Sequence, residues 1–171
     1  MNEELAVLKT STQYLNRADF PYMISGSIAL NYYAVPRMTR DIDIVIELKK
    51  QDIDRFIDMF QKDFFVDDEM IKKELSNRGM FNLIHKKYIV KVDFIIRKAS
   101  LYQDVAFARR KSVLVDNVPM WFISAEDLVL AKLLWAKDSY SAMQLGDIRS
   151  LLDGENKMDI IKDDRKNELY R

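Results

Sequence analysis

The spacing of hydrophobic and polar residues along the chain predicts alternating helices and strands. Leu5, Leu8 and Leu15 fall on one helical stripe near the start. The segment 41–47 alternates Asp and Ile and then becomes apolar, which is typical of a strand. The same reasoning predicts helices over residues 3–18, 28–34, 50–62, 68–76 and 141–152. Strands are predicted over residues 22–25, 41–47, 80–85 and 88–97, and at least one more within 113–123, where Pro119 indicates an edge or a bend.

The pattern changes after Ile123, where only helices are predicted. Ser124 and Asp127 in the sequence SAED resemble a capping box with Asp in place of Glu or Gln. The helix that follows is expected to bury the stripe Leu128, Ala131, Leu134 and Trp135. The order of elements predicts an α/β (α+β) fold, a mixed β-sheet flanked by helices, with a helical C-terminal extension. We expect residues 1–123 to form the core and residues 124–171 the extension, the tail 156–171 being either a third helix or frayed.

Composition narrows the class of protein without identifying it. The 171 residues suit one domain, and 27 basic side chains balance 27 acidic ones, so net charge favours no polyanionic partner. The absence of cysteine excludes disulfides and thiolate chemistry, and it fits a reducing cytoplasm. The N-terminus lacks the features of a signal peptide, and no apolar run approaches the roughly 20 residues that span a bilayer. We therefore expect a cytoplasmic protein without a membrane partner.

The residues with catalytic potential begin with Gly26 and Ser27, at a turn from a strand into a helix. A helix N-terminus presents free N–H groups to a phosphate, Gly26 allows close approach, and Ser27 adds a hydroxyl that can also cap the helix. Asp41 and Asp43 lie one residue apart on the next strand and share a face. Two like charges at the end of an apolar strand indicate a divalent metal between them.

A third carboxylate, Asp93, lies in the apolar strand sequence KVDFII. Three carboxylates can hold two Mg²⁺ (or Mn²⁺) ions, which brace the attacking and leaving oxygens of a phosphoryl group. Asp93 could instead accept the proton of an attacking hydroxyl. A structural reading stays open beside this one, because Asp93 could face solvent next to Lys91 and an Asp-x-Asp sequence alone is weak.

Other polar and aromatic residues are assigned structural positions and no catalytic role. His85, beside a Lys-Lys turn, is expected at the surface, and Trp135 in the core. Tyr32 and Tyr33 could stack on a base, but packing is the preferred interpretation. The basic run at residues 109–111 is expected to be solvated surface, although it could bind RNA.

The pattern Gly26-Ser27, thirteen residues (28–40) and then Asp41-Ile-Asp43 resembles the signature of the DNA polymerase beta-type nucleotidyltransferase superfamily. The runs RMTRDID and SAEDLVLAKLLWA, with the later GDIRSLL, further resemble the small bacterial AbiEii and MenT type, many of them toxin–antitoxin components. The resemblance covers nearly the whole chain, more loosely after residue 123. It implies metal-dependent transfer of a nucleoside monophosphate from an NTP to an acceptor, with release of pyrophosphate.

The resemblance also implies roles for individual residues. Gly26 and Ser27 would bind the triphosphate, while Asp41, Asp43 and Asp93 would hold the metals, with Asp93 as third ligand or base. Candidates for neutralising the phosphates are Arg37, Arg40, Lys132 and Lys137. Lys137-Asp138 and Asp147-Arg149 could supply the cation and acid that often follow the SAED helix in related chains.

The acceptor is left open by the sequence: RNA such as a tRNA end, a protein hydroxyl or a small molecule. Two other functions also stay open. One is a partner-binding component of a toxin–antitoxin pair, bound to its cognate toxin or antitoxin protein without turnover. The other is a metal-dependent phosphohydrolase, which the presence of a single histidine disfavours.

Overall fold

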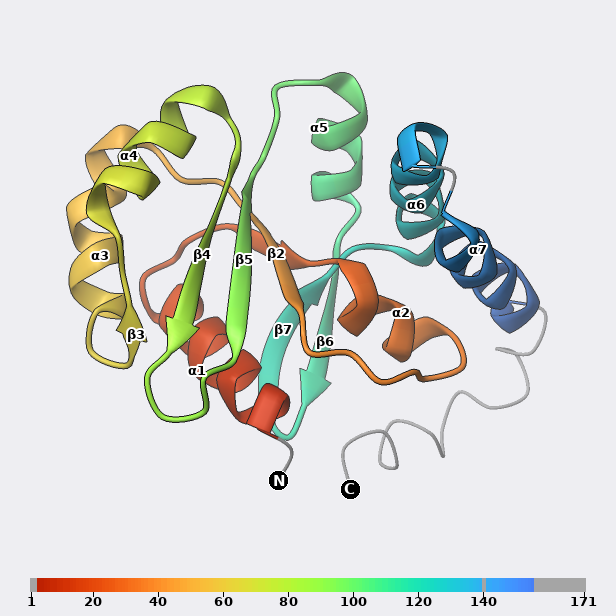
Figure 1. The fold of residues 1–171 in the computed structure, drawn as a ribbon, viewed down its shortest axis with the longest axis horizontal. Helices are drawn as coiled ribbons and strands as arrows, with labels where there is room; N and C mark the ends of the chain where they lie inside the picture. Colours follow the sequence, from red (N-terminus) through yellow and green to blue (C-terminus); the bar gives the residue numbers. More distant parts are fainter. Residues whose placement is uncertain (1–2, 140, 156–171) are drawn as a thin grey trace.

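The computed structural model describes residues 3–139 and 141–155, so the tail predicted over 156–171 lies outside the described residues. The strands are β1 (Tyr22–Ile24), β2 (Ile42–Ile46), β3 (Phe64–Phe65), β4 (Met80–His85), β5 (Lys91–Ile96), β6 (Lys111–Val115) and β7 (Val118–Phe122). The helices are α1 (Glu3–Arg17), α2 (Gly26–Tyr33), α3 (Ile53–Phe60), α4 (Asp68–Asn77), α5 (Leu101–Ala108), α6 (Ala125–Ser139) and α7 (Ala142–Glu155). Together they form the predicted mixed α/β fold (Figure 1).

All seven strands form one mixed sheet in the order β3-β4-β5-β2-β1-β7-β6. β2 lies near the middle, parallel to β5 and antiparallel to β1, and Ile42 pairs with Val92 at the start of the β2–β5 ladder. In Figure 1, α1 passes behind the strands while α2 lies in front of them. The sheet therefore has two faces with different neighbours.

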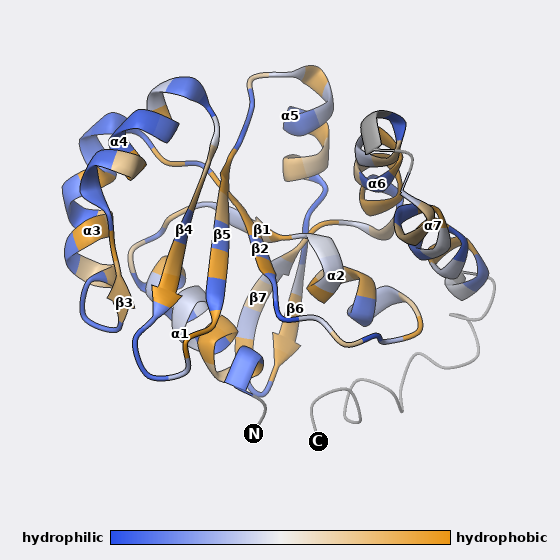
Figure 2. Cartoon of the chain, in the orientation of Figure 1, coloured by the Kyte–Doolittle hydropathy of each residue, from blue (hydrophilic) through white to orange (hydrophobic). Residues whose placement is uncertain are grey.

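The rear face of the central strands is apolar and closed. Ile42, Ile44 and Ile46 on β2 are fully buried, and Phe94 on β5 contacts Phe56 of α3 with ring centroids 5.4 Å apart. Figure 2 shows the hydrophobic central strands and the more hydrophilic outer helices α3 and α4. Side chains alternate between the two faces of a strand, so the residues between these buried ones on β2 and β5 point toward the front face.

The sequence predicted at least one strand within residues 113–123. The structure has two strands in this region, β6 and β7, which form a hairpin. Its turn residues Asp116 and Asn117 both have positive φ (47° and 63°), as a two-residue hairpin turn requires. Pro119 faces Leu114 in the second pair from the turn, where antiparallel strands exchange no hydrogen bond. β1 reaches β7 only at Phe122, so the missing N–H of Pro119 leaves no ladder bond unmade.

Several predicted boundaries differ from the structure. α2 begins at Gly26 with Ser25 as its N-cap, so Ser27 is not the cap. α7 continues to Glu155, beyond the predicted end at residue 152, and α5 was not predicted. Ser124 does cap α6, since the Asp127 N–H donates to its hydroxyl at 3.2 Å.

Two predictions about single side chains were wrong. His85 is buried, because it packs between Phe64 and Tyr88 while its Nδ1 accepts hydrogen bonds from the N–H groups of Lys87 and Tyr88. Trp135 is 66% exposed and Leu134 54% exposed. The stripe of α6 that packs inward is instead Ala125, Leu128, Lys132 and Ala136.

The helices α6 and α7 pack against each other and against α2. Leu128 and Leu151 belong to the same buried cluster as the sheet, and the Tyr33 hydroxyl donates to the carbonyl of Ile123 at 2.8 Å. Tyr32 packs on Phe122, so both tyrosines pack as preferred from the sequence. None of the helices over residues 3–139 and 141–155 combines the length and apolar character needed to cross a bilayer.

Candidate active site

Two of the predicted carboxylates lie side by side on the front face of the sheet. Asp43 on β2 pairs in register with Asp93 on β5, and residues paired in this way project to the same side. Asp93 is 6% exposed and Asp43 is partly buried. The site is thus built on the two central strands, whose positions are fixed by the apolar packing behind them.

The turn that starts α2 lies directly against Asp43. A Cβ placed on Gly26 would come within 1.9 Å of Asp43 Oδ2, and Gly26 has a φ of 59°. Any other residue would therefore meet both a steric clash and a strained backbone. The Ser25 N–H donates to the Asp43 carbonyl at 2.9 Å and fixes the turn to the strand. The structure brings together the predicted glycine turn and the predicted aspartate.

The electrostatics of this group call for a cation. Burial raises the pKa of Asp43, and the negative charges of Asp93 and Asp41 raise it further, against weaker opposition from Lys91 and Lys132. Asp93 Oδ1 is buried without a hydrogen-bond partner in the part of the chain that the structure describes. Buried carboxylate oxygens without partners fit a hard divalent cation such as Mg²⁺.

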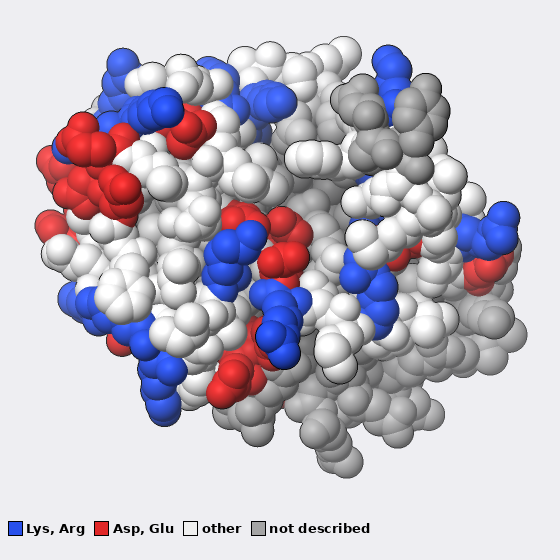
Figure 3. All heavy atoms as spheres, viewed as in Figure 1, with Lys and Arg blue, Asp and Glu red and all other residues white. Residues whose placement is uncertain are grey.

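Asp41 is the carboxylate that has not converged on the other two. Its side chain is 65% exposed, and it meets the Nζ of Lys91 at 3.7 Å, while the same Nζ lies 2.8 Å from Asp93 Oδ2. Figure 3 shows acidic and basic atoms side by side near the centre of this face. Within residues 3–139 and 141–155, no group of three or more His, Cys, Asp or Glu side chains has the arrangement of a metal site. Asp43 and Asp93 fit as ligands, and Asp41 would have to turn inward to join them.

Arg37 lies on the loop between α2 and β2 and faces the start of α2. Its Nη2 donates to Ser27 Oγ at 2.8 Å, and its Nε and Nη2 donate to the two oxygens of Asp147 on α7, both at 3.1 Å. The backbone of Arg37 is held by Asn31, whose side-chain amide accepts from its N–H at 3.0 Å and donates to its carbonyl at 2.8 Å. The guanidinium is therefore fixed beside the helix N-terminus by two separate elements.

Lys132 on α6 forms one charged cluster with Arg37 and Asp147, and it is buried, with 5% exposure. Its Nζ contacts Asp147 Oδ2 at 2.7 Å and Gln144 Oε1 at 3.3 Å. Burial alone would raise the pKa of Asp147, but the hydrogen bonds from Arg37 and Lys132 outweigh burial and lower the pKa. Of the two acids considered after the SAED helix, Asp147 is the one whose contacts the structure gives.

The sequence did not single out Asn31 and Lys91 for any role, although both position charges here. Alternation along β5 did place Lys91 on the face of Asp93, whereas no local pattern marks Asn31. Two other predicted residues make no ion pair with this cluster. Arg40 and Lys137 are exposed, and neither makes an ion pair with a described residue.

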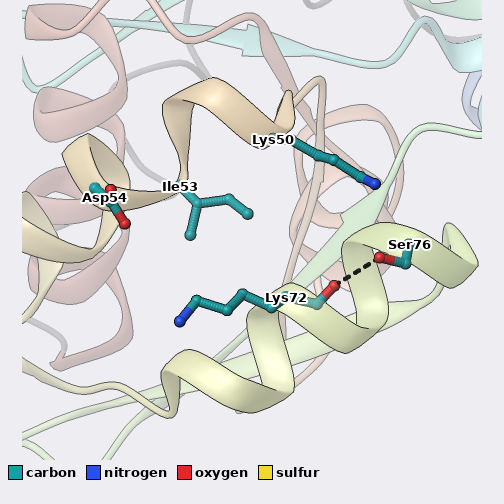
Figure 4. A pocket seen from close by; sticks show the side chains of 5 residues that line it. All are labelled: Lys50, Ile53, Asp54, Lys72 and Ser76. Carbon is teal, nitrogen blue, oxygen red and sulfur yellow. Dashed lines mark hydrogen bonds between the residues drawn. The ribbon is translucent and has the colours of Figure 1, made fainter.

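A separate hollow of about 240 Å³ lies between α3 and α4, lined by Lys50, Ile53, Asp54, Lys72 and Ser76. Figure 4 shows the Ser76 hydroxyl bonded to the backbone of Lys72, with both lysine side chains extended around an open space. Lys50 follows the far end of β2, so this hollow is distinct from the carboxylate site.

Solved structures share this architecture at low sequence identity. A nucleotidyltransferase-like antigenic protein of Paracoccidioides brasiliensis has a TM-score of 0.58 and 20% identity, covering 89% of this chain and 75% of that one. A nucleotidyltransferase candidate from Thermotoga maritima has a TM-score of 0.58, 15% identity, and 88% and 93% coverage. The chain has the nucleotidyltransferase fold. The lincosamide antibiotic adenylyltransferase LnuA, solved with lincomycin bound, shares this fold with a TM-score of 0.55, 14% identity, and 88% and 96% coverage.

No protein-family model and no curated protein sequence matches the chain. The nucleotidyltransferase fold is thus recognised from the arrangement of the strands and helices. The narrower resemblance to the AbiEii and MenT type rests on the sequence motifs alone.

Proposed function

We propose that this protein is a metal-dependent nucleotidyltransferase that moves a nucleoside monophosphate from an NTP to an acceptor hydroxyl and releases pyrophosphate. The observation that carries the proposal is the close fit of Gly26 against Asp43, with Asp93 paired beside it. This arrangement brings together, on one face of the sheet, a carboxylate pair and a helix N-terminus that would bind a phosphate.

Each group has a task that follows from its surroundings. The N–H groups at the start of α2 and the Ser27 hydroxyl would hold the triphosphate. Arg37 and Lys132 would offset its charge, since Arg37 contacts Ser27 and both cations share Asp147 as their acid. Asp93 would accept the proton of the acceptor hydroxyl or complete the metal site. Positioning and charge stabilisation of this kind account for most of phosphoryl-transfer catalysis.

Asp43, Asp93 and, after turning inward, Asp41 would hold Mg²⁺ or Mn²⁺. When bound, the ion would supply charge stabilisation to the transferring phosphoryl group. The orphaned Asp93 Oδ1 and the raised pKa of Asp43 support this assignment. Arg40 and Lys137, which are both exposed, are further candidates for contacts to the triphosphate.

The direct test is incubation of the protein with each α-labelled NTP, Mg²⁺ and cell extract. We expect one class of molecule to take up the label, with stoichiometric pyrophosphate. Lincomycin is a suitable purified small-molecule probe because LnuA was solved with it bound. RNA and protein acceptors are tested in the same extract by nuclease and protease treatment. Release of free phosphate without adduct would indicate a phosphohydrolase instead.

The matched variant is Asp43→Asn. It should abolish labelling and remove the rise in melting temperature that NTP and Mg²⁺ give together. The variant without ligand should melt above the wild type at pH 7, because it removes a carboxylate whose pKa is raised on folding. The control Asp54→Asn, at an exposed position on α3, should keep both labelling and ligand stabilisation.

One surface favours a second function, that of a partner-binding component of a toxin–antitoxin pair. The helices α6 and α7 expose Leu130, Leu133, Leu134, Met143 and Leu145, each more than 40% accessible. Exposed apolar patches mark interaction sites in soluble proteins. A stable second protein that co-purifies, together with no label transfer by the isolated chain, would support this function over the first. Either role suits a cytoplasmic protein.

A further inference from the structure

The Lys91 ammonium occupies the space between two of the carboxylates assigned to the metal. Lys91 is the first residue of β5 and lies two positions before Asp93, so both side chains leave the strand on the same face. Its Nζ lies 2.8 Å from Asp93 Oδ2 and 3.7 Å from Asp41 Oδ1. These are the only ion pairs that Asp41 and Asp93 make with any described residue.

The set of three aspartates needs such a cation when no metal is bound. Asp43 and Asp93 lie side by side as a register pair, Asp93 is almost completely buried, and the exposed Asp41 lies on the other side of the Lys91 ammonium from Asp93. Neighbouring negative charges repel one another more strongly in a buried site, where the dielectric constant is low. The more distant cation Lys132 is already committed to Asp147 and Gln144. Lys91 is therefore the cation that holds Asp41 and Asp93 together.

The Lys91 ammonium would compete with a divalent ion for the carboxylates of Asp41 and Asp93. A divalent ion held by Asp93 would lie close to the ammonium that contacts Asp93 Oδ2, and its charge would repel that ammonium. The Lys91 side chain is 44% exposed. Its flexible stem lets the ammonium move out into solvent or toward an incoming polyphosphate.

We propose that Lys91 is a resident counter-cation that a divalent metal displaces. This inference rests on the proposed function, because it takes Asp41 and Asp93 as metal ligands. Lys91 keeps the carboxylates assembled before the substrate arrives, and it weakens metal binding in the absence of nucleotide. When the metal–nucleotide complex binds, the triphosphate supplies a new anionic partner for the displaced ammonium.

The test is the Mn²⁺ affinity of the nucleotide-free protein, measured by isothermal titration and by electron paramagnetic resonance of free Mn²⁺. Lys91→Met preserves most of the side-chain length and removes the charge. It should bind Mn²⁺ about tenfold more tightly than the wild type, because one competing charge in contact with two carboxylates is gone. Lys91→Arg, which retains the charge, should stay close to the wild type. An unchanged or weaker affinity in Lys91→Met would overturn the proposal.

Lys72→Met controls for the loss of one positive charge elsewhere, since Lys72 is also an ion-paired lysine, with Glu69 as its acid, but lies on α4. It should leave Mn²⁺ affinity unchanged, and far-UV circular dichroism checks that each variant is folded. Adding Asp41→Asn to Lys91→Met should cancel the gain in affinity. Equal Mn²⁺ binding by wild type and Lys91→Met, with label transfer intact, would refute the displacement alone. Altered Mn²⁺ binding without any label transfer would instead refute the proposed function.

Discussion

Two backbone turns of the fold each depend on a single residue. Gly26 is one, because its positive φ and its contact with Asp43 both exclude a side chain. His85 is another, because its buried ring accepts two backbone hydrogen bonds and fills a gap between aromatic rings. Each gives a prediction that a single substitution can test.

Replacing Gly26 with alanine should destabilise the protein by more than about 1 kcal/mol, since an L residue at positive φ is strained and its Cβ would meet Asp43. Urea unfolding measures the change. Gly146 is the matched control, because it lies inside α7 and nothing lies within 4 Å of the position of its Cβ. Gly146→Ala should stabilise the protein by about 0.5–1 kcal/mol, the helix-propensity difference. Equal effects at the two glycines would contradict the close fit at Gly26.

His85 should make stability depend on pH below neutrality. Burial lowers the pKa of His85, against the opposing charge of Asp63. The unfolded chain therefore takes up a proton first, near the ordinary value of about 6.5. The stabilisation is complete above that pH and is lost as pH falls through the lower folded-state pKa.

The measurement is the free energy of unfolding in urea from pH 7.5 to pH 5. His85→Asn keeps an acceptor for the two N–H groups and cannot titrate, so it should flatten the decline in this range. If the wild type and His85→Asn lose stability in parallel, other groups cause the pH dependence.

At the scale of elements, one acid on α7 links α6 to the loop between α2 and β2. Asp147 accepts from both Arg37 and Lys132, and it is itself almost fully buried. A buried ion pair adds little net stability, but removing one partner leaves the other charge unpaired. The two single replacements in this pair should therefore differ in cost.

Asp147→Leu should cost about 3–5 kcal/mol, because it leaves the buried Lys132 without an acid. Lys132→Met should cost less, since Arg37 still pairs with Asp147. The double replacement should lie near the wild type, with Arg37 left partly exposed to water. Urea unfolding of all four proteins gives the coupling energy. Additive costs would show that Lys132 and Asp147 contribute independently.

Helices and strands with a clear hydrophobic periodicity were predictable from the sequence. Contacts that depend on ion pairs between distant residues were not. The alternation in 41–47 placed Asp43 opposite the buried isoleucines, and β5 followed the same rule. The inward stripe of α6 was misread because its buried positions include Lys132, which hydropathy assigns to solvent. The helix α5 was missed since its eight residues bury only Ala106 and Phe107. The Arg37–Asp147 pair joins residues 110 positions apart, beyond any local pattern.

At the scale of the whole molecule, the division at residue 123 stays a prediction. Leu128 of α6 and Leu151 of α7 lie in the same buried cluster as β2. If that cluster unfolds as one unit, the C-terminal helices should not open on their own.

Native-state hydrogen exchange in mild urea tests this directly. The amides of Ile44, Leu128 and Leu151 should converge on one opening free energy equal to that of global unfolding. A clearly lower value for Leu128 and Leu151 would show that residues 124–155 form a separately unfolding unit.

The link between Arg37 and Asp147 has a consequence for protein synthesis. A growing polypeptide carries its carboxylates and its glycine turn long before the ribosome adds Asp147. Until that late residue emerges, Arg37 lacks the acid that fixes its guanidinium beside Ser27. The last described helix thus completes the cluster, and premature termination would leave Arg37 with Ser27 and Asn31 as its partners and no acid.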